Sequence, residues 1–62
     1  MKTIFVFLAT GFEEIEALAP VDVLRRAGLN VQTVSIMNEQ AVVGAHGIPV
    51  VADKMFAEIN QE

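Results

Sequence analysis

The chain has 62 residues, room for one small domain, with no cysteine and a single histidine, His46. These counts exclude disulfides, thiolate or histidine-rich metal sites, and a cysteine nucleophile inside the chain. A hydrophobic content of 53% is too high for a disordered chain, and a net charge of −4 with only 4 scattered cations excludes the basic patch of a nucleic-acid-binding protein.

The first predicted element is a strand over residues 4–9 (IFVFLA), an unbroken apolar run that is mostly β-branched or aromatic. Such a run is typical of a strand covered on both faces in a parallel sheet. It is too short for a membrane span or for the core of a signal peptide. We therefore expect a soluble, cytoplasmic protein with neither a membrane nor a nucleic acid as partner.

A helix is predicted for residues 12–27, with signals at both ends. Thr10 followed by Glu13 fits a capping box with Thr10 at the N-cap, and Gly28 is typical of the position just after a helix. Arg25 and Arg26 lie in the last turn, where the helix dipole favours cations. These two arginines could bind an anion or a partner chain, or could form only a solvated helix end.

Pro20 stands in the middle of this predicted helix. A proline there removes one backbone hydrogen bond and clashes with the carbonyl group four residues earlier. We therefore expect a kink or a break near Glu16 or Ala17.

A second strand is predicted over residues 30–36, so that strand, helix and strand form a βαβ unit with a parallel pair. Residues 41–43 and 48–51 flank the sequence GAHG and predict a short hairpin, in which Pro49 favours an edge position. Asp53 could cap a final short helix over residues 54–59. The predicted fold class is α/β.

Glu16 occupies an unusual position on a helical wheel of about 100° per residue. It lies within roughly 20° of Val23 and Ala27, on the apolar side of the helix, and it directly follows Ile15 in the sequence. Four charged residues gather on the opposite side, the predicted solvent face: Glu14, Asp22, Arg25 and Arg26.

A buried Glu16 would suit catalysis, because this end of the helix lies beside the carboxyl ends of the strands, where α/β sheets bind ligands. Burial raises the pKa of a carboxyl group, and a protonated carboxyl can act as a general acid or tune a thiolate. In the alternative, Pro20 rotates the first turn and returns Glu16 to water.

Two other signals are weak. The turn after the first strand has only Gly11 where a dinucleotide site needs G-x-G-x-x-G, and two glutamates there would repel a phosphate, so we predict no nucleotide cofactor. His46 could be a ligand or a base, but the sequence shows no partner for it, which favours a surface residue.

The segments GFEEIEALAPVDVLRRAGLNV and VVGAHGIPVVAD resemble the opening of the ThiJ/PfpI family, which includes the Parkinson-associated deglycase and intracellular protease I. The shared pattern is G-[FA]-E-E-x-E followed by P-x-D-x-[LM]-R-R-A-G. It extends from about Lys2 to Asp53 and covers only the first third or so of a family member.

The resemblance implies a flavodoxin-like α/β sandwich of three layers. Residues 1–62 would be the N-terminal portion of one such domain, namely its βαβ unit and a short hairpin. Glu16 matches the third glutamate of the motif, which in the family lies beside a nucleophilic cysteine and is protonated or shares a proton with the sulfur. Gly11 would hold its loop close to the cysteine pocket. In many members the first helix, here with Pro20, Arg25 and Arg26, takes part in a homodimer contact.

The family's cysteine, its L-P-G-G segment and its catalytic histidine have no counterpart in these 62 residues, and His46 does not match that histidine. We therefore expect that this chain alone is no enzyme and needs the remainder of the domain, from the same or a separate chain.

The complete protein would be a cysteine-dependent hydrolase or a glyoxalase- or deglycase-like enzyme of the protease I type. It would act on small carbonyl compounds or glycated groups, without a cofactor or a metal. The alternatives are a non-enzymatic redox sensor or chaperone of the same fold, or a structural half-domain that only pairs with its partner.

Overall fold

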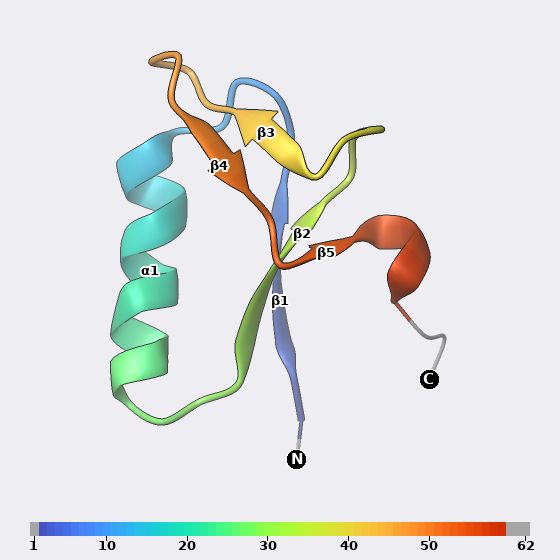
Figure 1. The fold of residues 1–62 in the computed structure, drawn as a ribbon. Coiled ribbons are helices and arrows are strands. Elements are labelled where there is room, and N and C mark those ends of the chain that lie inside the picture. The colour runs from blue at the N-terminus through green and yellow to red at the C-terminus, as the bar shows by residue number, and fades with distance from the viewer. Residues whose placement is uncertain (1, 60–62) are drawn as a thin grey trace.

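The computed structural model describes residues 2–59 and begins with a βαβ unit (Figure 1). β1 (Ile4–Leu8) and β2 (Val31–Ser35) pair in parallel along their whole length. α1 (Glu14–Arg26) connects these two strands and packs against both. The predicted strands, the helix and the parallel pairing are thus confirmed.

β3 (Ala41–Val43) and β4 (Pro49–Val51) form the expected antiparallel hairpin, which is a separate two-stranded sheet. β5 (Lys54–Met55) then pairs in parallel with β2 and completes a three-stranded sheet in the order β1-β2-β5. A 3-10 helix, Phe56–Glu58, follows. The turn of the hairpin lies at the same end of the molecule as the start of α1 (Figure 1).

The expectation of a short helix over residues 54–59 capped by Asp53 is met only in part, since the 3-10 helix starts at Phe56 and Asp53 does not cap it. Oδ2 of Asp53 accepts hydrogen bonds from the Thr33 backbone N–H (2.9 Å), the Thr33 hydroxyl (3.1 Å) and Arg25 (2.6 Å). The Asp53 N–H in turn donates to the Thr33 hydroxyl oxygen at 2.9 Å. These bonds hold Asp53 against β2, so the next two residues extend the sheet.

The expected capping box at Thr10 is also wrong, because α1 begins only at Glu14, with Glu13 as N-cap and no side-chain cap. A turn closed by the Phe12 N–H on the Ala9 carbonyl at 3.0 Å, with Gly11 at φ +90°, delays the start of the helix.

The other end of α1 is as expected. Gly28 has φ +87°, a left-handed conformation that glycine adopts freely. Its N–H donates to the Arg25 carbonyl at 3.0 Å, and the Leu29 N–H donates to the Leu24 carbonyl at 3.1 Å. This pair of bonds is a Schellman motif, which ends the helix before Gly28.

Pro20 does not break the helix, which is continuous from Glu14 to Arg26. The carbonyl that loses its helical partner belongs to Glu16, in the first turn. Both residues are exposed, so water can replace the missing hydrogen bond.

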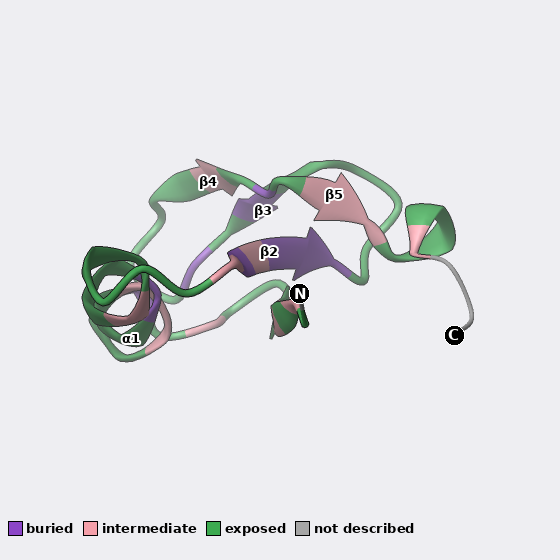
Figure 2. Ribbon diagram, turned by 90° about the horizontal axis from the view of Figure 1, so that it is seen from below, coloured by how far each residue is buried: buried purple, intermediate pink, exposed green. Residues whose placement is uncertain are grey.

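The core lies between the hairpin and the carboxyl end of β1. Leu8, Val42 and Ala52 form a buried cluster, and Phe12 and Ala17 are among the residues packed against it. Figure 2 shows that β2, the middle strand of the sheet, is the most buried element.

The prediction that β1 is buried on both faces is wrong for this chain. Only Leu8 is fully buried, while Phe7 is 52% exposed and Ile4 is 38% exposed. Within residues 2–59, β1 has one neighbouring strand and the sheet has one covering helix, so one edge and one face of β1 stay open.

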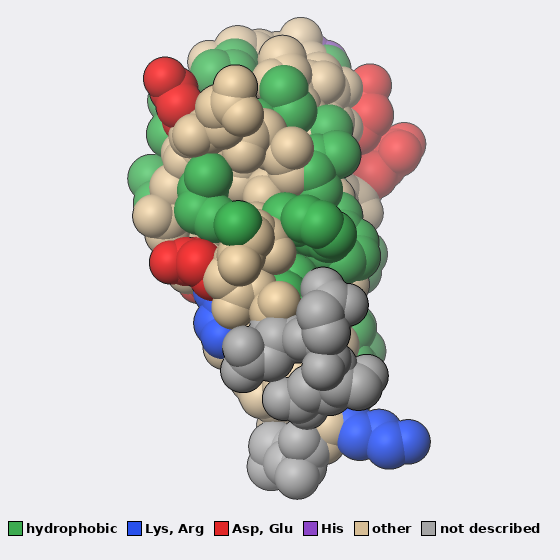
Figure 3. Space-filling view, turned by 90° about the vertical axis from the view of Figure 1, so that its right-hand side faces the viewer, with side chains coloured by type: hydrophobic (Ala, Val, Ile, Leu, Met, Phe, Trp, Pro, Cys, Tyr) green, Lys and Arg blue, Asp and Glu red, His purple; other side chains and the backbone are tan. Residues whose placement is uncertain are grey.

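Figure 3 shows hydrophobic side chains over much of the face at the right-hand side of Figure 1. Phe56 is 54% exposed, and its ring centroid lies 6.0 Å from that of Phe7. None of the described helices has the length and apolar character needed to cross a membrane.

Asp53→Ala should lower the free energy of unfolding of the full-length protein by about 1–2 kcal/mol at pH 7, because it removes hydrogen bonds from a partly exposed carboxylate. Asp22→Ala is the matched control, since it removes only an exposed ion pair with Arg26 at 3.0 Å, worth about 0.5 kcal/mol. Urea unfolding measures both variants.

The Asp53 effect should depend on pH. The Thr33 backbone N–H, with help from the Thr33 hydroxyl and from Arg25, holds the pKa of Asp53 below its ordinary value of 3.8. The stabilisation is therefore fully present above pH 3.8 and is lost as the pH falls through the lower pKa of the folded protein. If Asp53→Ala and Asp22→Ala lower the free energy of unfolding equally at pH 7, the stabilising role of the Asp53 hydrogen bonds is contradicted.

Candidate functional site

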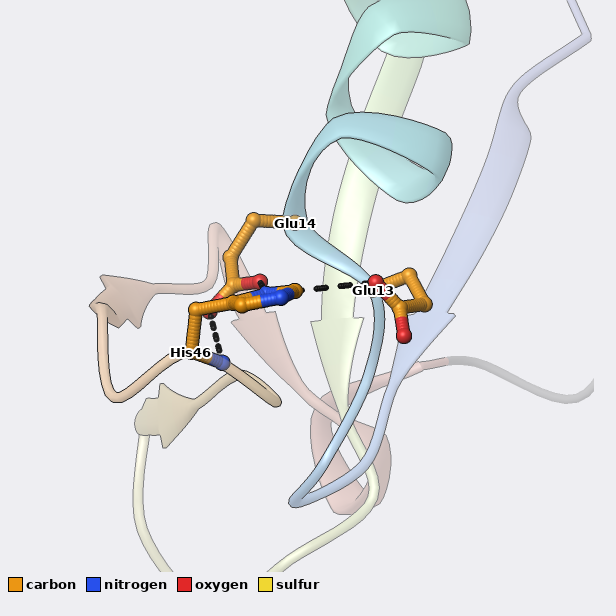
Figure 4. A group of neighbouring side chains, drawn as sticks. All are labelled: Glu13, Glu14 and His46. Carbon is orange, nitrogen blue, oxygen red and sulfur yellow. Dashed lines mark hydrogen bonds and ion pairs between the residues drawn. The ribbon is translucent and has the colours of Figure 1, made fainter.

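The loop between β1 and α1 is bonded to the turn of the hairpin. The Gly11 N–H donates to the Val43 carbonyl at 2.9 Å, and the Ala45 N–H donates to the Phe12 carbonyl at 2.7 Å. Segments more than thirty residues apart therefore meet where the helix begins. Figure 4 shows the side chains that they bring together.

Glu14 is the central side chain of this meeting point. Its Oε2 accepts hydrogen bonds from the backbone N–H of His46 at 2.9 Å and of Ile48 at 3.4 Å. Its Oε1 lies 2.8 Å from Nδ1 of His46, where an Nδ1–H can donate (Figure 4). The side chain of Glu14 is only 8% exposed.

The prediction that Glu14 belongs to the solvent face is therefore wrong. The residues of α1 that turn inward form a stripe at helical spacing: Glu14, Ala17, Val21 and Leu24. The hairpin covers the polar end of this stripe and satisfies its carboxylate, which offsets the cost of burying a charge.

The two groups shift each other's pKa. The hydrogen bond from the His46 side chain, with the backbone N–H groups of His46 and Ile48, lowers the pKa of Glu14 from 4.5 to about 2, against the opposing effect of burial. The hydrogen bond to Glu14, with the charges of Glu14 and Glu13, raises the pKa of His46 above its ordinary 6.5.

His46 is 70% exposed, so the prediction of a surface residue is confirmed, but its pairing with Glu14 was missed. One residue of the sequence, Gly44, reflects that contact. A Cβ atom at Gly44 would lie 2.7 Å from Cγ of Glu14 and closer still to the carboxylate, so only glycine fits there.

Glu13, Glu14 and His46 each offer one ligand atom, and these atoms lie within 4.8 Å of one another. That spacing is compatible with a metal ion, but Nδ1 of His46 and Oε1 of Glu14 are hydrogen-bonded to each other at 2.8 Å, so the structure assigns them as a hydrogen-bonded pair rather than as metal ligands. One oxygen of Glu14 is already committed to backbone N–H groups.

Glu16 is exposed in the first turn of α1, and α1 begins at the end of the molecule where β1 ends (Figure 1). The expectation that its side of the helix is buried is wrong for this chain, since Val23 is 61% exposed and Ala27 is exposed as well. The inward stripe that starts at Glu14 turns these residues outward. Within residues 2–59, the carboxylate of Glu16 has no hydrogen-bonded side-chain partner.

Gly11 has φ +90°, which explains why glycine occupies this turn, and it lies in the loop just before α1. Its predicted role beside a cysteine pocket stays a prediction.

The three residues predicted as partner contacts lie along α1, away from this meeting point. Pro20 is exposed, and Arg26 pairs with Asp22. Arg25 donates two hydrogen bonds to the Val31 carbonyl, at 3.0 and 2.8 Å, and one to Asp53. The guanidinium of Arg25 thus links α1 to β2.

Residues 2–62 match the family model described as the DJ-1/PfpI family, so the chain belongs to this family. The resemblance to ThiJ/PfpI proteins is confirmed. The fold is a short fragment of the flavodoxin-like fold, with a parallel sheet and one helix, as predicted.

Three relatives illustrate the similarity. Protein DJ-1 homolog A of Arabidopsis thaliana is 40% identical over 58 residues, which are 94% of this chain and 15% of the relative. A cysteine-to-alanine mutant of a DJ-1 superfamily protein from Salmonella typhimurium is 46% identical with a TM-score of 0.88, over 94% of this chain and 31% of that one. Oxidized Toxoplasma gondii DJ-1 is 37% identical with a TM-score of 0.87, over 92% of this chain and 31% of that one. The chain therefore spans about a third or less of these relatives.

Gly44→Ala should displace the Glu14 carboxylate from the hairpin turn, because the added methyl group takes its place. The pKa of His46, followed by NMR titration of its ring protons in the full-length protein, should then fall toward 6.5. Ala45→Ser, at the neighbouring exposed position, is the control and should leave the titration unchanged. An unchanged His46 pKa in the Gly44 variant would show that the close packing of Gly44 on Glu14 is wrong.

Proposed function

We propose that this chain is the N-terminal part of a DJ-1/PfpI enzyme in which Glu16 is the acidic partner of a nucleophilic cysteine. The cysteine would come from the remainder of the domain, in the same or a separate chain. The reaction would be that of a hydrolase, or of a glyoxalase or deglycase of the protease I type, on small carbonyl compounds or glycated groups.

The observation that carries this proposal is the different state of the glutamates at the start of α1. Glu14 is buried, and both of its carboxylate oxygens are hydrogen-bonded to the hairpin. Oε1 of Glu13 lies 3.9 Å from Nδ1 of His46. Glu16, which matches the third glutamate of the family motif, is exposed and without such a partner in the described residues. It is therefore the carboxyl group best placed to meet a residue from outside the chain.

The position of Glu16 also suits a thiolate partner. The first turn of a helix favours negative charge, because its backbone N–H groups are unpaired and its dipole is positive there. A cysteine held beside this turn would ionise more easily, and the thiolate is the nucleophilic form. Glu16 could take up the proton that the thiol loses, and could then donate it to the oxygen that becomes negative when the thiolate attacks a carbonyl carbon.

The remainder of the domain would also cover the open face and edge of β1, where Phe7 is half exposed. The outward residues Ile15 and Val23 of α1, with Pro20 and Arg26 on the same helix, would contact a second copy in a homodimer. The proposed compartment is the cytoplasm.

Glu16→Gln in the full-length protein should lower kcat/KM for methylglyoxal by about a hundredfold or more, the usual contribution of a general acid or base. Glu39→Gln, in an exposed loop before β3, is the control and should keep full activity. Normal kinetics of the Glu16 variant would rule out the proposed role.

A redox sensor or chaperone is the second candidate, favoured by the oxidized state in which Toxoplasma gondii DJ-1 was solved. Peroxide treatment and mass spectrometry separate the two functions. If the protein is an enzyme, it should turn over methylglyoxal in a Glu16-dependent way before any oxidation. Selective addition of two oxygens to one cysteine without any turnover would favour the sensor. A full-length protein with no cysteine near Glu16 would leave only a structural half-domain.

A further inference from the structure

We propose that Glu14 and His46 form a pH-sensitive latch, which fixes the turn of the hairpin to the first turn of α1 and so positions Glu16. The latch itself stands on contacts within this chain. Only its effect on Glu16 rests on the proposed function.

The first turn of α1 needs an external anchor, since its N-cap, Glu13, supplies no side-chain hydrogen bond. The hairpin provides three anchors: the Gly11–Val43 bond, the Ala45–Phe12 bond and the bonds to Glu14. The last of these attaches the first helical residue. Glu16 follows two residues later in the same turn, so its position depends on how firmly Glu14 is held.

The charges around His46 come from one element only. Glu14 and Glu13 face it from the start of α1, with oxygens 2.8 and 3.9 Å from its Nδ1 (Figure 4). Residues 41–51 of its own hairpin contain no other titratable side chain. Arg25 and Arg26 lie at the far end of a 13-residue helix, about 18 Å away. Protonated His46 is therefore the cation that balances the two carboxylates.

The pH range of the latch follows from both partners. Because the pKa of His46 is raised, its contribution is complete below pH 6.5 and is lost as the pH rises through the higher pKa of the folded protein. Because the pKa of Glu14 is lowered, its contribution is complete above pH 4.5 and is lost as the pH falls to about 2. The latch is thus strongest between pH 4.5 and 6.5. At higher pH a neutral imidazole keeps the hydrogen bond but not the charge.

The test compares His46→Gln and His46→Arg with the wild type in the full-length protein. Both replace an exposed side chain, and arginine keeps a permanent positive charge that does not titrate in this range. Hydrogen exchange by NMR reports the protection of the backbone amide of residue 46, which donates to Glu14.

At pH 5.5, His46→Gln should lower this protection roughly tenfold, the effect of losing one charge-assisted hydrogen bond. His46→Arg should keep it, and should keep it at pH 8.5 as well, where the wild type loses part of its protection. Equal protection of this amide in the wild type and in His46→Gln at pH 5.5 would overturn the latch. An equal loss of amide protection in His46→Gln and His46→Arg would overturn it as well.

The effect on Glu16 is measured separately, as kcat against pH. His46→Gln should lower kcat about fivefold at pH 5.5 with KM unchanged, and His46→Arg should restore it, because positioning changes the chemical step more than binding. If the protection falls but kcat does not, the latch does not position Glu16. If Glu16→Gln is fully active while the protection follows the predicted pattern, the proposed function is wrong and the latch remains.

Discussion

The hydrogen bonds between the Glu14 carboxylate and the turn of the hairpin are the interaction on which the arrangement of this chain depends. A two-stranded hairpin is at best marginally stable by itself. Here it is held because a nearly buried carboxylate receives two backbone N–H groups and an imidazole. That contact brings Val42 onto Leu8 and Phe12, and so creates the only fully buried cluster in residues 2–59 that joins the hairpin to β1.

A second carboxylate, that of Asp53, acts at the other end of the hairpin. It binds Thr33 in β2 and Arg25 in α1, so it connects three elements where the chain leaves β4. Glu14 holds the turn of the hairpin, and Asp53 holds its exit. Two charged groups of an apolar sequence thus determine how the hairpin is joined to the rest of the chain.

The local features of the fold could be predicted from the sequence. Apolar runs mark β1 and β2, Gly28 marks the end of α1, and the GAHG turn marks the hairpin. The partners of Glu14 and Asp53 could not be predicted, because they lie 32 and 20 residues away and leave no periodic signal. The helical wheel failed for the same reason: it treats a glutamate as solvent-facing, whereas the hairpin makes Glu14 an inward residue. Glu16 was selected by the family motif and by a wheel argument that the burial of α1 does not support.

The open edge of β1 has a consequence for handling this chain. Its outer backbone N–H and C=O groups are unpaired within residues 2–59, next to the half-exposed side chains of Ile4 and Phe7. An open edge flanked by apolar side chains is a template for pairing with the same edge of another molecule. These 62 residues, when expressed separately, would therefore be prone to aggregate unless the rest of the fold is present during synthesis.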